Sequence, residues 1–176
     1  FFSAALKQMQ ALQEEGYIDA DASVDLLENK IVLIVPKGSE EGYTSFEDIV
    51  NADMAAIGDP ESVPAGQYGK EALENLGLWS EVENKLSLGT NVTEVLNWVA
   101  EQSADAGIVY ATDAASIPDK VTIIAAAPEG SVSKVIYPVA ELKDTANKEA
   151  ADAFMEFLQS ADALKVFEEA GFTINQ

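Results

Sequence analysis

Three short segments of this sequence place hydrogen-bond donors where strand-like runs give way to helix-like runs. The first is the loop 58–66, which two prolines stiffen ahead of a predicted helix. The second is Gly89–Val92, which also leads into a predicted helix, and the third is Tyr110, the last residue of a predicted strand. Ligands of open α/β sheets bind outside the carboxyl ends of the strands, so these segments are candidate ligand loops.

The donors in these segments suit an anion. The first turn of a helix has unpaired N–H groups and carries about half a positive charge. The amides of Ala65 and Val92, together with the Tyr110 hydroxyl, could therefore hold a dianion without Lys or Arg. Every helix begins with unpaired N–H groups, however, so the pattern alone also fits ordinary connecting loops.

Composition removes several classes of chemistry. The 176 residues include no cysteine and no histidine, which excludes a Ser-His-Asp triad, a Cys-His dyad and an imidazole or thiolate metal site. The net charge of −21 disfavours nucleic acid and anionic membrane surfaces as partners. It does not forbid a local anion site, because charges beyond roughly 8–10 Å are largely screened at physiological salt. No apolar run reaches the length of about 18 residues that indicates a membrane span.

Asp59 and Glu61 offer a different chemistry within the first loop. Two carboxylates could act as an acid/base pair or bind a divalent metal, as in a hydrolase. A turn role is favoured, because Asp before Pro is typical of turns and a carboxylate facing a dianion would repel it. Asp113, three residues after Tyr110, is predicted to cap the next helix rather than to touch a ligand.

The candidate loops require strands and helices that alternate along the chain, which predicts an α/β fold with a mainly parallel sheet. The segment 135–140 contains Pro138 and is predicted to be an edge or crossing strand. The other predicted strands are 31–35, 54–57, 85–88, 106–110 and 121–125, and the predicted helices occupy 45–50, 65–76, 92–99, 150–158, the segment after Ser160, and the segment between Ser3 and Gly16.

Five blocks of this sequence resemble periplasmic molybdate-binding proteins, and their order and spacing along the chain are also similar to that family. The ligand-loop block is Gly58-Asp59-Pro60 with Val63-Pro64-Ala65-Gly66 and Tyr68, and a second signature is Gly107-Ile108-Val109-Tyr110 with Asp113-Ala114. Two crossing segments, 29–34 and 135–140, and the closing segment 167–172 are also similar to that family.

This resemblance implies the type II periplasmic-binding-protein fold, in which two lobes joined by crossing strands close on the ligand. Residues 36–128 are expected to form the complete ligand-binding lobe. Residues 1–35 and 129–176 are expected to form the remainder of the other lobe, which would be incomplete because an N-terminal part is missing. The family's hydroxyl-bearing loops of that lobe would precede Phe1.

The resemblance also implies a solute-binding role for an ABC importer rather than an enzyme. Carried over to this sequence, the donors to molybdate or tungstate are the amides of Ala65 and Val92 and the hydroxyl of Tyr110. The partner would be a membrane permease, the location periplasmic or extracellular with a lipid anchor, and no cofactor or directly bound metal cation is expected.

Donors alone suit molybdate, which is a fully deprotonated dianion at neutral pH and accepts hydrogen bonds only. Hydrogen phosphate carries a proton that such a site leaves unpaired, at a cost of roughly 1–3 kcal/mol. Sulfate presents the same acceptors as molybdate but is smaller, so a site for sulfate or another small anion remains an alternative. An organic acid is disfavoured, because the candidate loops contain no arginine to grip its carboxylate.

Overall fold

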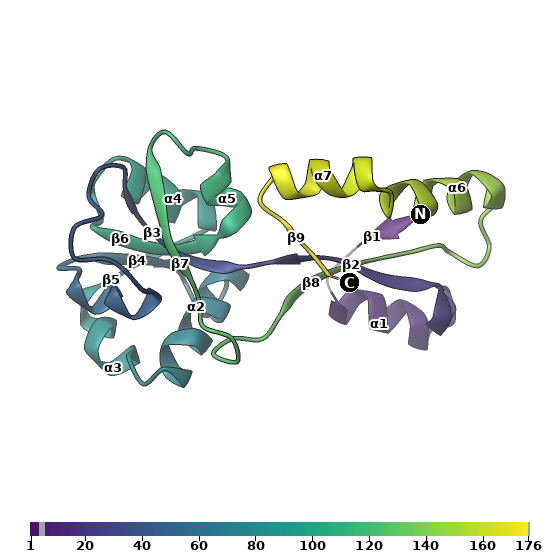
Figure 1. Cartoon of the computed structure of the whole chain (residues 1–176). Helices are drawn as coiled ribbons and strands as arrows, with labels where there is room; N and C mark the ends of the chain where they lie inside the picture. Colours follow the sequence, from purple (N-terminus) through teal and green to yellow (C-terminus); the bar gives the residue numbers. More distant parts are fainter. Residues whose placement is uncertain (4–5, 176) are drawn as a thin grey trace. The chain divides into compact units, whose positions relative to one another are not determined.

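In the computed structural model, which describes residues 1–3 and 6–175, the chain forms two compact units (Figure 1). Unit 1 comprises Phe1–Asn29 and Lys134–Gln176, and unit 2 comprises Lys30–Ser133. The chain therefore enters unit 2 once, after Asn29, and leaves it once, after Ser133.

Unit 2 extends beyond the predicted lobe of residues 36–128 at both ends. Strand β3 (Ile31–Pro36) belongs to unit 2 because it pairs with two other strands there. At the other end, the Ser131 carbonyl accepts a hydrogen bond of 2.9 Å from Asn75 Nδ2, and Ser133 donates to Glu71. The structure divides the chain at 29/30 and 133/134, a few residues outside the predicted boundaries at 35/36 and 128/129, because pairing and hydrogen bonds hold both flanking segments within unit 2.

The sheet of unit 2 has the strand order β5-β4-β6-β3-β7, formed by Leu86–Gly89, Ala55–Gly58, Ala106–Tyr110, Ile31–Pro36 and Val121–Ala126. Strand β4 is parallel to β5 and β6, whereas β3 is antiparallel to β6 and β7. The predicted α/β class is confirmed, and four of the five strands run in the same direction, as a mainly parallel sheet requires, with β3 opposed to them. A strand that is buried on both faces carries an unbroken apolar run in either direction, and all six residues of β3 are buried.

Helices cover both faces of this sheet. The helical segments of unit 2 are α2 (Pro64–Asn75), α3 (Trp79–Val82), α4 (Val92–Ala100) and α5 (Ala111–Ala115), with 3-10 turns η2 (Phe46–Asn51) and η3 (Glu83–Lys85). A Cβ added to Gly107 would lie 2.7 Å from Val99 of α4, whereas one added to Gly69 of α2 would lie 3.2 Å from Ile108. Successive residues of a strand point to opposite faces, so α4 and α2 lie on opposite faces of the sheet.

The sheet of unit 1 is antiparallel and has the order β1-β8-β2-β9, formed by Phe2–Ser3, Val135–Ala140, Ser23–Asn29 and Thr173–Ile174. Of the two positions predicted for the segment that contains Pro138, the crossing strand agrees with the structure, because β8 begins directly after the chain passes from unit 2 to unit 1. The edge strand does not, because β8 pairs with both β1 and β2. Pro138 is tolerated there because it pairs with Asp25, where the register of β2 slips before Leu27. The Pro138 carbonyl accepts a hydrogen bond from the Ser3 hydroxyl.

The helices of unit 1 are α1 (Leu6–Glu14), α6 (Lys148–Leu158) and α7 (Ala161–Glu169), with the 3-10 turn η1 (Ala20–Ala22). The helix predicted between Ser3 and Gly16 is thus present from Leu6, while positions 4 and 5 lie outside the described residues. The Ser160 hydroxyl caps α7 by accepting from the Ala163 N–H, as the sequence predicts. None of the described helices is long and apolar enough to cross a membrane.

Candidate functional site

The structure brings the three predicted ligand loops to one edge of unit 2. Strands β5, β4 and β6 are adjacent and parallel, and Gly58 at the end of β4 pairs with Gly89 at the end of β5. The chain then enters α2, α4 and α5, so Ala65 and Val92 lie in the first turns of two helices. Tyr110 is the N-cap residue of α5. Two helix starts and one phenol-bearing residue therefore gather at the carboxyl ends of three neighbouring strands.

The first loop is held by Asp59. Its N–H donates to the Gly89 carbonyl at 2.8 Å, and its carbonyl accepts from the N–H groups of Ser62 and Val63. Its carboxylate accepts from the Glu61 N–H and the Ser62 hydroxyl. The turn role predicted for Asp59 is confirmed, because both carboxylate oxygens hold the loop's own donors.

A close approach of two backbones explains the glycines of this loop. A Cβ added to Gly66 would collide with the Gly58 carbonyl group, and one added to Gly58 would lie 2.6 Å from Val63 Cγ1. Only glycine at position 66 lets the first turn of α2 lie directly against the end of β4. Ala65 is buried there, and Pro64 occupies the start of the helix, where a missing N–H costs nothing.

The second loop is closed by a network of side chains. The Asn91 side chain caps α4 by accepting from the Glu94 N–H at 2.9 Å, as predicted. The Glu94 carboxylate accepts from the N–H and the hydroxyl of Thr90, at 2.7 and 2.9 Å, rather than from the Asn91 N–H of a standard capping box. The Thr90 N–H is the main cause that lowers the pKa of Glu94. Val92, the first residue of α4, lies in sequence between the bonded residues Thr90 and Glu94.

The third loop is held by Asp113, in the first turn of α5. Its carboxylate accepts a hydrogen bond from the Tyr110 backbone N–H, so the predicted capping role of Asp113 is confirmed. Burial raises the pKa of Asp113, and the Tyr110 hydrogen bond opposes that shift. On the other side of Tyr110, the Ala111 N–H donates to the Lys30 carbonyl at 2.8 Å. The backbone around Tyr110 is thus held by Asp113 of α5 and by the Lys30 carbonyl.

Neither Lys30 nor Glu94 was assigned to the candidate site from the sequence alone. Lys30 is a basic residue beside the candidate site, since the next residue, Ile31, pairs with Tyr110. Its proximity depends on antiparallel pairing across 80 positions, for which the sequence carries no local signal. Glu94 was predicted as a capping partner, but its bonds to Thr90 show that it also shapes the second ligand loop.

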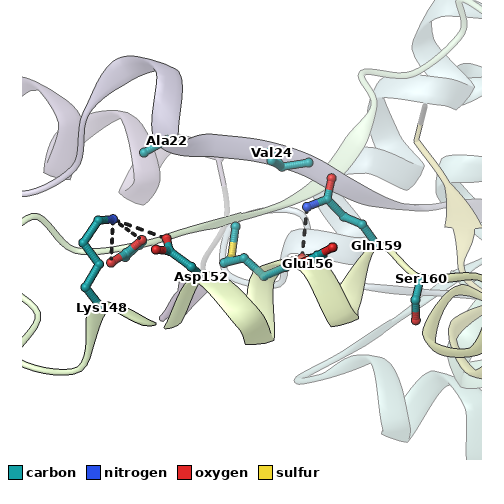
Figure 2. A pocket seen from close by; sticks show the side chains of 9 residues that line it. Ala22, Val24, Lys148, Asp152, Glu156, Gln159 and Ser160 are labelled. Atoms are coloured by element: carbon teal, nitrogen blue, oxygen red, sulfur yellow. Dashed lines mark hydrogen bonds and ion pairs between the residues drawn. The ribbon is translucent and has the colours of Figure 1, made fainter. Parts of the chain in front are cut away.

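A cavity in unit 1 has a different character (Figure 2). It measures about 730 Å³ and lies between α6 and the segment that contains Ala22 and Val24. Lys148 is engaged there by Glu141 at 3.1 Å and Asp152 at 3.3 Å, and Glu156 also lines the cavity. Three carboxylates around one ammonium leave this cavity with a negative balance, which disfavours an anion. Among the described residues, no cluster of acidic side chains has the arrangement of a metal site.

Residues 1–173 match the bacterial extracellular solute-binding proteins, and the chain belongs to this family. The chain is 44% identical to YvgL of Bacillus subtilis, a lipoprotein assigned provisionally as substrate-binding for an ABC transporter, over 98% of this chain and 66% of that protein. It is 37% identical to the molybdate-binding protein ModA of Escherichia coli, over 99% of this chain and 69% of ModA.

A solved structure from Clostridium difficile, the substrate-binding domain of a provisionally assigned molybdenum ABC transporter, superposes with a TM-score of 0.91. It is 36% identical, and the match covers 99% of this chain and 76% of that one. These likenesses confirm the predicted periplasmic-binding-protein fold. The chain spans about two thirds of the length of the two curated relatives.

Proposed function

We propose that this protein captures molybdate or tungstate outside the cytoplasm and delivers it to the membrane permease of an ABC importer. The observation that carries the proposal is the gathering of two helix starts and Tyr110 at the carboxyl ends of β5, β4 and β6. The names of the relatives, which include molybdate-binding ModA, support the same ligand. A location in the periplasm, or outside the cell on a lipid anchor, fits the proposal and the lipoprotein YvgL.

The ligand donors in this proposal are the amides of Ala65 and Val92 and the hydroxyl of Tyr110. Amides at helix starts supply fixed partial positive charge, so an acidic chain needs no formal cation at the ligand. The nearby carboxylates of Asp59 and Glu94 are bonded to donors of their own loops. We propose binding without catalysis, and without a cofactor or directly bound metal cation.

Calorimetric titration of the natural gene product with four anions tests the ligand. We expect tight binding of molybdate and tungstate, and weak or absent binding of sulfate and phosphate. Phosphate should be rejected because its proton finds no acceptor, and sulfate because it is too small for donors spaced around molybdate. Equal affinity for sulfate and molybdate would instead favour the alternative of a general binding protein for small anions.

Variants distinguish this proposal from the carboxylate-dependent hydrolase. Tyr110→Phe removes one charge-assisted hydrogen bond and should cost about 1.5–3 kcal/mol, or roughly 10- to 150-fold in affinity for molybdate. Asp59→Asn keeps an acceptor for the Glu61 N–H and removes a negative charge, so affinity should stay the same or rise slightly. The hydrolase predicts the reverse order, with Asp59 indispensable and Tyr110 dispensable.

The amide at position 65 has its own matched pair of variants. Ala65→Pro deletes the N–H donor and should weaken molybdate binding at least as much as Tyr110→Phe, whereas Ala65→Gly keeps the N–H. Thermal unfolding of both variants separates a lost donor from a lost fold, since Ala65 is buried. Equal molybdate affinities of the two folded variants would show that the Ala65 N–H does not contact the ligand.

A further inference from the structure

One carboxylate beside the candidate site is in an uncommon state. Asp113 Oδ2 is buried and has no hydrogen-bond partner among the described residues. The same carboxyl group accepts a hydrogen bond from the Tyr110 N–H, and burial raises its pKa. Buried polar groups in folded proteins are nearly always paired, so an unpaired carboxylate oxygen calls for a role that outweighs its cost.

Within the described structure, the elements that pack on α5 supply no ion pair that would explain the position of Asp113. Helix α5 packs against β3, β6, β7 and α4. Strands β3 and β7 have no ionisable side chain, β6 has only Tyr110, and α4 has only Glu94, which is bonded to Thr90. The bond to the Tyr110 N–H is therefore the contact in the described structure that accounts for the carboxylate.

The position of the Tyr110 N–H shows why this bond matters. Strand β6 pairs with β4 at Ala106 and Gly107, so its last residue, Tyr110, lies beyond that pairing. On its other edge β6 pairs with β3, where the Ala111 N–H donates to the Lys30 carbonyl. Tyr110 has extended backbone angles, φ −76° and ψ 150°, at the point where the chain turns into α5. The Asp113 carboxylate accepts from the Tyr110 N–H at this turn and so restrains the backbone that carries the phenol.

We propose that Asp113 is the positioning residue of the oxyanion site, acting through the Tyr110 amide to hold the phenol in place for the ligand. This inference rests on the proposed function. The acceptor oxygen of Asp113 is what the role requires, whereas its negative charge near a bound dianion is a disadvantage. Asparagine, which keeps an acceptor oxygen in the same place, should therefore replace it, and alanine should not.

A double-mutant cycle with Tyr110 tests whether Asp113 acts through that residue. Molybdate affinity of the natural gene product is measured by calorimetry for the parent, Asp113→Ala, Asp113→Asn, Tyr110→Phe and the double variant Asp113→Ala/Tyr110→Phe. We expect Asp113→Ala to lose roughly 3- to 30-fold in affinity in the parent background and less than about 2-fold in the Tyr110→Phe background. Asp113→Asn should bind as tightly as the parent or more tightly, with the gain larger at low salt.

Two results of the cycle would overturn the inference. Equal losses from Asp113→Ala in both backgrounds would mean that Asp113 does not act through the phenol. A loss in Asp113→Asn as large as in Asp113→Ala would mean that the charge, not the acceptor, matters. A merely structural role would lower the unfolding temperature of Asp113→Ala without coupling its affinity loss to Tyr110.

Hydrogen exchange of the Tyr110 amide, measured by NMR on ligand-free protein, separates this inference from the proposed function. The amide should be protected in the parent and in Asp113→Asn, and should exchange faster in Asp113→Ala. Unchanged exchange in a folded Asp113→Ala variant would overturn the inference whatever the ligand is. A parent that does not bind molybdate would overturn the proposed function, and with it the role of Asp113 in binding, while its bond to Tyr110 would stand as a helix cap alone.

Discussion

The inner strands β3 and β4 of unit 2 are buried on both faces, whereas unit 1 leaves several aromatic side chains in contact with solvent. Every residue of β3 and β4 is buried, and Phe46 of η2 is only 1% exposed. In unit 1, Phe154 and Phe157 of α6 are 42% and 55% exposed, and Phe154 packs edge-on against Phe1. The candidate donors thus lie in the unit whose described core is more completely enclosed, where packing can hold them still.

The two units also use charge differently. The cavity of unit 1 is lined by Glu141, Asp152, Glu156 and Lys148, so charged side chains determine its electrostatic character. The candidate site of unit 2 depends on backbone N–H groups, whose positions are set by how helices pack on strand ends. A chain with a net charge of −21 can therefore present an anion site, provided that the packing which aims those amides is kept.

Truncating one phenylalanine in each unit should give the largest difference between the units in free energy of unfolding. Phe46→Ala empties a buried position in unit 2 and should lower the free energy of unfolding by about 3–5 kcal/mol. Phe157→Ala removes a side chain that is already 55% exposed, and should change it by less than about 1 kcal/mol. Urea unfolding measures both, and equal costs would contradict the contrast in packing between the units.

Two glycines of α2 test the close contact behind the first ligand loop. Gly66→Ala places a Cβ against the Gly58 backbone and should cost about 2–3 kcal/mol, with a matching loss of molybdate affinity. Gly69→Ala, one turn later, meets only the Ile108 side chain at 3.2 Å and gains helix propensity, so its stability should change little. Thermal unfolding and calorimetry compare them, and a harmless Gly66→Ala would show that α2 need not lie against β4.

Two helix caps should have similar effects on stability and different effects on binding. Asn91→Ala and Ser160→Ala each remove a side chain that accepts an N–H in the first turn of a helix, at a cost of about 1 kcal/mol. Asn91 also closes the second ligand loop, so its variant alone should weaken molybdate binding. Affinity losses of the same size in both variants would argue against a site at the start of α4.

The smallest expected effect concerns how the unfolding temperature falls at acid pH, which Asp48 of unit 2 should influence. Hydrogen bonds from the Thr44 N–H, the Ser45 N–H and the Thr44 hydroxyl hold the pKa of Asp48 below its usual value. A carboxyl group whose pKa is lowered in the folded state stabilises that state above its unfolded pKa of about 4, and this stabilisation is lost as the pH falls through the folded pKa.

Asp48→Asn should therefore flatten part of the fall in unfolding temperature between about pH 5 and pH 2. Asp21→Asn, an exposed aspartate of unit 1, controls for the loss of one charge. Melting curves that respond identically in the two variants would show that the Thr44 and Ser45 bonds contribute nothing to the acid response.

Local patterns predicted the parts of the fold that depend on neighbours in sequence. The apolar run 31–35, the cap at Asn91 and the turn at Asp59 were each found as predicted, because a few adjacent residues determine them. Strand β2 was missed along most of its length, because its burial alternates irregularly around the slip between Asp25 and Leu27. The capping box of Ser45 and Asp48 was predicted and is present, although the helix that it begins is a 3-10 turn.

The sequence by itself determined the α/β class and the three candidate loops, since the spacing of glycine, proline and apolar residues records where strands end and helices begin. Tertiary structure alone decided that β3 is antiparallel to β6 and β7, that Lys30 and Tyr110 are neighbours, and that one oxygen of Asp113 is left unpaired. Each of these depends on contacts between residues distant in the chain or on the burial of a single atom. Such features have no short-range pattern, because the same local residues are compatible with several strand pairings.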